Sequence, residues 1–181
     1  MTVPVPGYTI REEVYEGKRT VVLRAVRDAD ARPVMLKRLK SSSPSTDILR
    51  LRHEERMLRK VGSTAVIGPL GIEEGPGHAA LVIEDFGAEA LAAVHQRARL
   101  AIGHVLSVAV QVARALEDIH AAGIVHRDIN PANIVMHQET GEVKVIDFGI
   151  ASELRAEEAS GRIRTSLKGR WRTSRRSRRG G

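Results

Sequence analysis

Two short polar segments, each flanked by apolar residues, restrict the fold of this chain more than any other feature of its sequence. Residues 125–135 read Val-His-Arg-Asp-Ile-Asn-Pro-Ala-Asn-Ile-Val, and residues 145–149 read Val-Ile-Asp-Phe-Gly. The apolar residues predict short strands, and the polar residues between them predict loops. Binding and catalytic residues concentrate on loops that a rigid scaffold holds in place. We therefore expect these two loops to carry the chemistry of the chain.

Three side chains on these loops suit a divalent cation. Asp128, Asn133 and Asp147 offer hard oxygen ligands. Mg²⁺ binds through few protein carboxylates and keeps phosphate and water oxygens among its ligands. A single aspartate in a loop of this kind is usually a turn residue. Two acids and an asparagine at this joint spacing favour a site instead.

The two segments together resemble the catalytic loop (H-R-D-L-x-x-x-N) and the D-F-G motif of protein kinases. Both motifs occur in the expected order and at the expected separation, each in a strand–loop–strand context. The resemblance implies that Asp128 is the catalytic base, which orients the substrate hydroxyl and accepts its proton. It also implies that Asn133 and Asp147 bind Mg²⁺, and that His126 and Arg127 support the loop.

The resemblance extends upstream to the lysine that contacts the α- and β-phosphates of ATP. Residues 34–37, Val-Met-Leu-Lys, are similar to the V-A-I-K motif of the third strand, which gives Lys37 this role. Its partner should be a helical glutamate. Glu54 fits, because Leu58 and Val61 follow it at +4 and +7 on the apolar face of a predicted helix. Taken alone, Glu54 would be interpreted as a helix-edge residue with its carboxylate in water.

The resemblance also implies where the nucleotide binds. Ile83 aligns with the gatekeeper residue, and the backbone of Glu84 and Phe86 is expected to bind adenine. The other residues expected around ATP are Val14, Gly17, Val22 and Val135.

The glycine-rich loop departs from the family pattern. Kinases use G-x-G-x-x-G-x-V so that backbone N–H groups can approach the phosphates. Here only the central Gly17 remains, and Tyr15 and Thr20 occupy the other two glycine positions. Side chains there restrict the loop and argue against tight ATP binding, unless the charge of Lys18 or Arg19 compensates.

A second departure lies two residues after the expected base. Serine/threonine kinases usually have a lysine there, which helps to neutralise the transferring phosphoryl group, and this chain has Asn130. We count Asn130 with Asp128 and Lys37 as a catalytic residue, because its amide can donate a hydrogen bond. It carries no charge, so we expect weaker stabilisation of the transition state.

The pattern of the chain agrees with an α+β, protein-kinase-like bilobal fold. The resemblance implies a five-stranded N-lobe with one helix over 8–84, a hinge at 85–88, and an incomplete, mainly helical C-lobe over 89–155, with ATP between the lobes. Apolar periodicity predicts strands over 8–14, 20–26, 34–39, 65–72 and 79–83, and helices over 48–61 and 102–122. Gly123 should end the second helix. Because the expected activation segment and substrate-binding subdomain do not follow, that helix should expose apolar surface.

Residues 156–181 form a basic tail, which we expect to be disordered. Nine of the 29 Lys and Arg residues lie between 162 and 179, where no acid occurs, so the rest of the chain has a net charge of −2. The tail could contact nucleic acid or an acidic membrane, with Trp171 available to stack, or be merely solvated. We favour a frameshift product, since 167–181 can encode, two bases displaced, a peptide containing Gly-Thr-Leu-Ala-Tyr-Ile-Ser-Pro-Glu, which resembles the end of a kinase activation segment.

Composition excludes several other classes. The chain has no cysteine, which excludes disulfides, thiolate catalysis and Cys-ligated zinc and fits a reducing compartment. We expect a cytoplasmic location, since no secretory signal or membrane segment is visible. The implied function is a protein serine/threonine kinase that uses ATP and Mg²⁺, inactive if the missing segments are essential. The alternatives are a nucleotide-binding pseudokinase or scaffold and, less favoured, a nucleic-acid binder that uses the tail.

Overall fold

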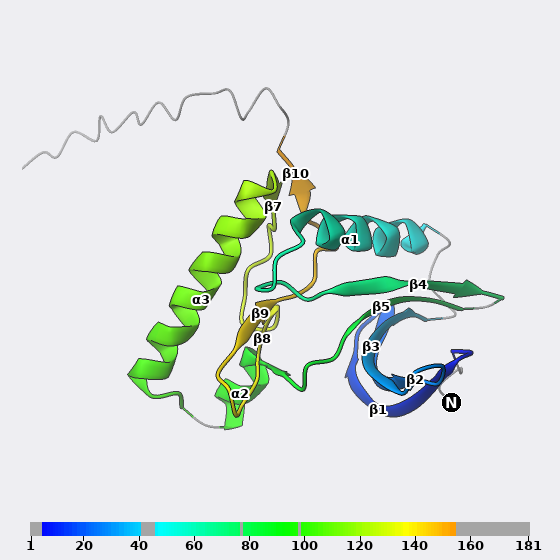
Figure 1. Ribbon diagram of the computed structural model, residues 1–181, viewed down its shortest axis with the longest axis horizontal. Coiled ribbons are helices and arrows are strands. Elements are labelled where there is room, and N and C mark those ends of the chain that lie inside the picture. Colours follow the sequence, from blue (N-terminus) through cyan, green and yellow to red (C-terminus); the bar gives the residue numbers. More distant parts are fainter. Residues whose placement is uncertain (1–4, 41–45, 77, 98, 155–181) are drawn as a thin grey trace, which may run out of the picture.

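A five-stranded antiparallel sheet forms the first half of the chain (Figure 1). The computed structural model describes residues 5–40, 46–76, 78–97 and 99–154. The sheet has the order β1-β2-β3-β5-β4 and consists of β1 (Tyr8–Glu16), β2 (Thr20–Arg27), β3 (Arg32–Leu39), β4 (Pro69–Gly75) and β5 (His78–Glu84). The five predicted strands are thus present, and all but β4 lie within two residues of the expected bounds.

Successive side chains of β2 and β3 point to opposite faces of this sheet, so the two faces have different surroundings. Val21, Leu23 and Leu36 are buried on one face, in an apolar cluster with Val82 of β5. The residues between them on β2 and β3 therefore project to the opposite face. That face carries Lys37 and borders the site described below.

One helix, α1 (Asp47–Val61), packs on β4 and β5, and Figure 1 shows it lying above β4 and running alongside it. Leu51, Glu54 and Leu58 are buried on its inner face, as the periodicity predicted. The helix ends at Gly62, which adopts the left-handed conformation with φ +59° and donates its N–H to Leu58 O at 3.2 Å.

The predicted strand over 65–72 is wrong at its start, because β4 begins only at Pro69. Proline has no N–H to donate and is tolerated as the first residue of an edge strand. Residues 65–67 lie instead beside β9 (Val143–Val145): Val145 N–H donates to Ala65 O at 3.0 Å, and Ile67 N–H donates to Val145 O at 3.1 Å. This seam joins the two halves of the molecule.

The second half combines two helices with short strands. It contains β6 (Glu89–Ala90), α2 (Leu91–Arg97), α3 (Ile102–Ala121), β7 (Ile124–Val125), β8 (Ile134–Met136), β9 and β10 (Ser152–Glu153), with sheets ordered β6-β8-β9 and β10-β7. The predicted stop of α3 is confirmed, since Gly123 follows its cap with φ +71°. The sequence reading missed β6, α2 and β10.

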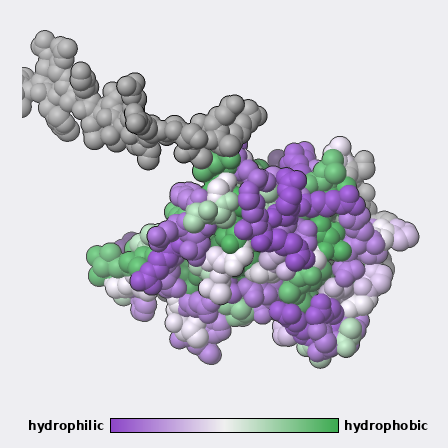
Figure 2. Space-filling model, turned by 45° about the horizontal axis from the view of Figure 1, so that its top comes forward, coloured by the Kyte–Doolittle hydropathy of each residue, from purple (hydrophilic) through white to green (hydrophobic). Residues whose placement is uncertain are grey.

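The expected exposure of apolar surface on α3 is also confirmed. Val108, Ala115 and Ile119 are buried on one side of the helix, whereas other apolar side chains are exposed: Ile102, Val105, Leu106 and Val110. Figure 2 shows apolar surface at the end of the molecule where α3 begins. In the described part of the chain, no helix is long and apolar enough to cross a bilayer.

The main apolar core is shared by both halves. Leu51 and Met57 of α1 and Leu81 of β5 belong to the same buried cluster as Ile119 of α3 and Phe148. The connection between the halves is short, since β5 ends at Glu84 and β6 begins at Glu89. The predicted architecture, a five-stranded sheet with one helix followed by a second part that contains helices, is confirmed, and its shared core fixes the cleft between the two parts.

Candidate active site

A cavity of about 730 Å³ lies between the sheet and the second half. Eight of the nine residues expected around a nucleotide line it, together with both expected metal ligands. These ten residues are Val14, Val22, Lys37, Glu54, Ile83, Glu84, Phe86, Asn133, Val135 and Asp147. They come from four strands of the large sheet, from α1, from the connection after β5, from β8 and from the loops beside β8 and β9, so the fold gathers residues that lie far apart in the sequence.

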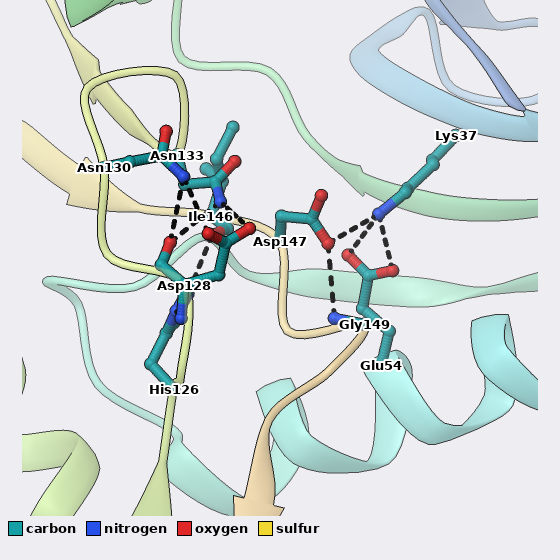
Figure 3. Close-up of polar contacts among 9 residues, drawn as sticks. All are labelled: Lys37, Glu54, His126, Asp128, Asn130, Asn133, Ile146, Asp147 and Gly149. Carbon is teal, nitrogen blue, oxygen red and sulfur yellow. Dashed lines mark hydrogen bonds and ion pairs between the residues drawn. The ribbon is translucent and has the colours of Figure 1, made fainter. Parts of the chain in front are cut away.

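Lys37 joins two carboxylates inside this cavity (Figure 3). Its Nζ donates to Glu54 Oε1 at 2.9 Å and Oε2 at 2.7 Å, and to Asp147 Oδ1 at 2.9 Å. Lys37 projects from β3, Glu54 from α1 and Asp147 from the loop after β9. The Glu54 side chain is only 6% exposed, so the interpretation of Glu54 as a solvated helix-edge residue is wrong.

The electrostatics of this trio follow from one cation shared by two acids. Burial raises the pKa of Glu54, and Lys37 offsets that effect only in part. Burial alone would lower the pKa of Lys37, but the two carboxylates outweigh it and raise that pKa. Burial also disfavours the charge on Asp147, yet Lys37 and the Gly149 N–H leave the pKa of Asp147 lowered. The more exposed Asp147 therefore keeps its negative charge and suits a cation ligand.

The backbone at Asp147 is held in an uncommon conformation. Its φ is +64°, which non-glycine residues adopt rarely and at some energetic cost. The Gly149 N–H donates to Asp147 Oδ1 at 3.2 Å. A Cβ on Gly149 would lie 3.2 Å from Asp147 Oδ1 and 3.6 Å from Glu54 Oε2, so a side chain there would crowd the Asp147 carboxylate. Phe148 between them is fully buried and anchors the turn.

His126 connects the two motif loops. Its ring is buried against Phe148, with centroids 4.6 Å apart and an edge-to-face angle of 72°. His126 Nδ1 accepts the Asp128 N–H at 3.2 Å, so Nε2 carries the proton that is donated to Ile146 O at 3.0 Å. Burial lowers the pKa of His126, which keeps the ring neutral and able to make both bonds. Arg127, with φ +70°, completes a turn that is also strained.

Two asparagines hold the carboxylate of Asp128 (Figure 3). Asn130 Nδ2 donates to Asp128 Oδ1 at 2.9 Å, and Asn133 Nδ2 donates to Asp128 Oδ2 at 2.9 Å. Asn130 Oδ1 in turn accepts the Ala132 N–H at 2.8 Å, which fixes the orientation of its amide. Asn130 thus orients Asp128 in this structure. Asp128 and Asn130 are not among the residues that line the cavity. Asn133, which bonds Asp128, does line it and connects the two residues to the cavity.

Two oxygens in the cavity fit a magnesium ion. Asn133 uses its amide nitrogen for Asp128, and Asp147 uses Oδ1 for Lys37 and Gly149. Among the residues that the structure describes, neither Asn133 Oδ1 nor Asp147 Oδ2 accepts a hydrogen bond. Hard oxygen donors of this kind suit Mg²⁺, which also takes phosphate and water ligands. Asn133 and Asp147 are therefore the residues that would hold the ion.

Gly17 is the expected nucleotide residue that does not line the cavity. Its N–H donates to Thr20 O at 2.9 Å in the turn between β1 and β2, and a Cβ on it would come within 3.1 Å of the Tyr15 ring. Tyr15 and Thr20 themselves line the cavity, at two positions where kinases have glycine. The site therefore has side chains where the family uses bare backbone.

Sequence reasoning missed several lining residues that alternation could have found. Arg24 lies two residues after Val22 on β2, and Met35 two residues before Lys37 on β3, so each shares a face with a predicted contact. Ile146 directly precedes Asp147. Asp85, in the connection after β5, gave no such signal, because it lies outside any regular strand.

The protein kinase domain model matches residues 8–171. The chain belongs to the protein kinase domain family. Serine/threonine-protein kinase PknA of Mycobacterium tuberculosis is 37% identical over 163 residues, which are 82% of this chain and 36% of that protein. Serine/threonine-protein kinase Pkn1 of Myxococcus xanthus is 36% identical over 107 residues, or 58% of this chain and 15% of that protein. Extracellular signal-regulated kinase 1 of Candida albicans is 26% identical over 155 residues, which are 83% of this chain and 37% of that protein.

The chain thus spans only about a third (36%) of the length of PknA. The kinase domain model also runs past residue 155, where the motif resemblance stopped, into the predicted basic tail. The predictions of a disordered tail and of a frameshift lie outside the residues that the structure describes.

Proposed function

We propose that this protein is a serine/threonine kinase, which transfers the γ-phosphoryl group of ATP to a hydroxyl group of a protein with the help of Mg²⁺. The observation that carries the proposal is two groups of contacts at one cavity: Lys37 with Asp147, and Asn133 with Asp128. The Ile146 N–H, next to Asp147, donates to Asn133 O at 3.0 Å and joins the two groups. A phosphate-binding cation, two oxygen ligands for a metal and a held carboxylate are the parts that phosphoryl transfer requires.

Each residue has a role that follows from its chemistry. Lys37, held by Glu54, would bind the α- and β-phosphates, and Asn133 and Asp147 would hold Mg²⁺, which neutralises phosphate charge when bound. Asp128 would accept the proton of the attacking hydroxyl, since its two oxygens are oriented by amide donors. The backbone of Glu84 and Phe86 would bind adenine. Positioning and electrostatics supply most of the catalysis in this reaction.

The acceptor class rests on the relatives. PknA and Pkn1, which share 37% and 36% identity with the matched segments, are both named serine/threonine-protein kinases. We propose the same acceptor hydroxyls for this chain.

We also propose a cytoplasmic location, where ATP and Mg²⁺ are available. The absence of cysteine agrees with a reducing compartment.

Two observations favour a second candidate, a pseudokinase that binds nucleotide without transferring phosphate. Tyr15 and Thr20 border the cavity where phosphates would approach the loop backbone. Asn130 also supplies no positive charge beside Asp128. Both features weaken transition-state stabilisation more than they weaken adenine binding.

Phosphoryl transfer from ATP tests the proposal directly. The full chain is incubated with radiolabelled ATP and Mg²⁺, alone and with a generic protein acceptor, beside Asp128→Ala. We expect Asp128→Ala to bind ATP with unchanged affinity and to lower the transfer rate by about 10²–10⁴-fold. ATP binding without transfer by the wild-type chain would establish the pseudokinase instead, and the absence of binding would exclude both candidates.

A further inference from the structure

A buried lysine outside the cavity contacts two of its predicted adenine-binding residues. Lys144 Nζ donates to Glu84 Oε1 at 2.6 Å and lies 4.8 Å from the centre of the Phe86 ring. Its side chain is only 11% exposed. Lys144 does not line the cavity, whereas Glu84 and Phe86 do. The Lys144 side chain can therefore act on a nucleotide through these two residues.

Glu84 is held from a second direction by the segment that precedes β4. Gly68 N–H donates to Glu84 Oε1 at 3.0 Å, and Glu84 N–H donates to Gly68 O at 2.9 Å. A Cβ on Gly68 would lie 3.3 Å from the Glu84 carboxyl carbon, so the close approach depends on glycine. Burial alone would raise the pKa of Glu84, but Lys144 and the Gly68 N–H leave that pKa lowered, which keeps the carboxylate charged.

The position of Lys144 in the chain links the two ends of the cavity. It lies on β9, pairs with Val135 on β8 and precedes Asp147 by three residues. Val135 lines the cavity, and Asp147 is the expected metal ligand. One side chain thus joins the strand that leads to the metal end of the cavity to the connection at its adenine end.

We propose that Lys144 is a positioning residue for the nucleotide, which fixes the 84–86 connection relative to β9 and Asp147. The inference rests on the proposed binding of ATP in the cavity. A buried Lys–Glu pair contributes little net stability, because desolvation offsets the attraction, so its value lies in fixed geometry. The pair, the Phe86 contact and the Gly68 bonds together hold the adenine-binding backbone in one arrangement before the nucleotide arrives.

Calorimetric titration of the full chain with ATP and Mg²⁺ measures this effect. If Lys144→Met leaves about a tenth of the molecules with the connection in place, the dissociation constant rises about tenfold. Lys144→Arg, which keeps the charge, should restore most of the affinity. Glu84→Gln should weaken binding in the same way. The double variant Lys144→Met/Glu84→Gln should be no weaker than Lys144→Met, because both changes break one contact.

Lys60→Met is the matched control. Lys60 forms a Lys–Glu pair with Glu153 at the same 2.6 Å distance, but neither residue lines the cavity. Lys60→Met should therefore leave the affinity of the chain for ATP unchanged. If Lys144→Met binds ATP as tightly as the wild type, or if the effects of Lys144→Met and Glu84→Gln are additive, the proposed positioning role is wrong.

Amide hydrogen exchange of the nucleotide-free chain provides a readout that does not depend on ATP. Residues 84–88 should exchange faster in Lys144→Met than in the wild type and in Lys60→Met, because the contacts that hold them are lost. A wild-type chain that fails to bind ATP would exclude the proposed function, while exchange would still decide whether Lys144 fixes the connection. Equal exchange in all three proteins would overturn the inference.

Discussion

At the scale of single residues, the main result is how Asp128 is held. Asn130 and Asn133 each donate one amide hydrogen to a different oxygen of its carboxylate. Two neutral donors fix the direction of the lone pairs without placing a positive charge beside the reacting phosphoryl group. The site is therefore well suited to orient a hydroxyl and less suited to stabilise the charge that develops during transfer.

Substitutions of Asn130 separate these two effects. Asn130→Ala should lower the transfer rate, because Asp128 loses one of its orienting bonds, and should leave ATP affinity unchanged. Asn130→Lys should raise the transfer rate by up to about 10²-fold, because it adds a charge near the transferring group. Initial rates and ATP titrations measure both. A lysine variant no faster than the wild type would contradict the electrostatic argument.

The Lys37–Glu54 pair makes a prediction about stability and binding together. Lys37→Met leaves Glu54 buried without its cation, so unfolding in urea should show a loss of about 3–5 kcal/mol. The double variant Lys37→Met/Glu54→Leu should recover most of this stability, since no unpaired charge remains at Glu54. Neither variant should bind ATP as tightly as the wild type. Full recovery of ATP binding by the double variant would show that the pair serves stability alone.

Local motifs were enough to predict most of the site, but not the contacts between distant residues. Lys37, Glu54 and Asp147 could be predicted because each stands in a recognisable pattern. Lys144 looks like an ordinary strand lysine, since its partner Glu84 is 60 residues away. The ring of Tyr15 could not be placed against Gly17 either, because a turn sequence does not state which way an exposed aromatic side chain folds.

At the scale of elements, length decided what the sequence could predict. α1 and α3 repeat their apolar pattern over 15 and 20 residues, which is long enough to recognise. α2 has only seven residues, and β6 and β10 have two each, so they show no period. The late start of β4 has a different cause, because residues 65–67 are apolar enough for a strand but pair with β9.

Substitution by alanine should change the free energy of unfolding in opposite directions at two glycines near the ends of α3. Gly123 follows the end of α3 with φ +71°, and nothing lies within 4 Å of a Cβ built on it. Gly123→Ala should therefore lower the free energy of unfolding by about 1 kcal/mol through backbone strain alone. Gly103 lies in the first turn of α3 with equal space around it. Gly103→Ala should gain about 0.5 kcal/mol. Urea unfolding measures both, and equal effects would exclude the conformational explanation.

At the scale of the whole molecule, the two motif loops make stability depend on pH through His126. Burial lowers its pKa below the ordinary value of 6.5 in the folded protein. Below pH 6.5 the unfolded chain therefore binds a proton that the folded protein resists, and stability falls as the pH falls toward the lowered pKa. Above pH 6.5 this contribution is complete.

Urea unfolding at pH 7.5 and at pH 5.5 measures this contribution. The wild-type chain should be less stable at pH 5.5. His126→Gln should be less stable than the wild type at pH 7.5, because it loses the packing against Phe148, and should lose less on acidification. The explanation fails if both proteins show the same dependence on pH.

The seam between residues 65–67 and β9 has a mechanical consequence. Its two backbone bonds cross between the halves, and Ile67, which makes one of them, lines the cavity and belongs to the shared apolar core. A motion that separated the halves evenly would break both bonds in the low-dielectric interior, where they are strongest. Rotation about the seam leaves them intact. Relative motion of the two halves should therefore be a rotation about residues 65–67 and β9, which would change the width of the cavity between them.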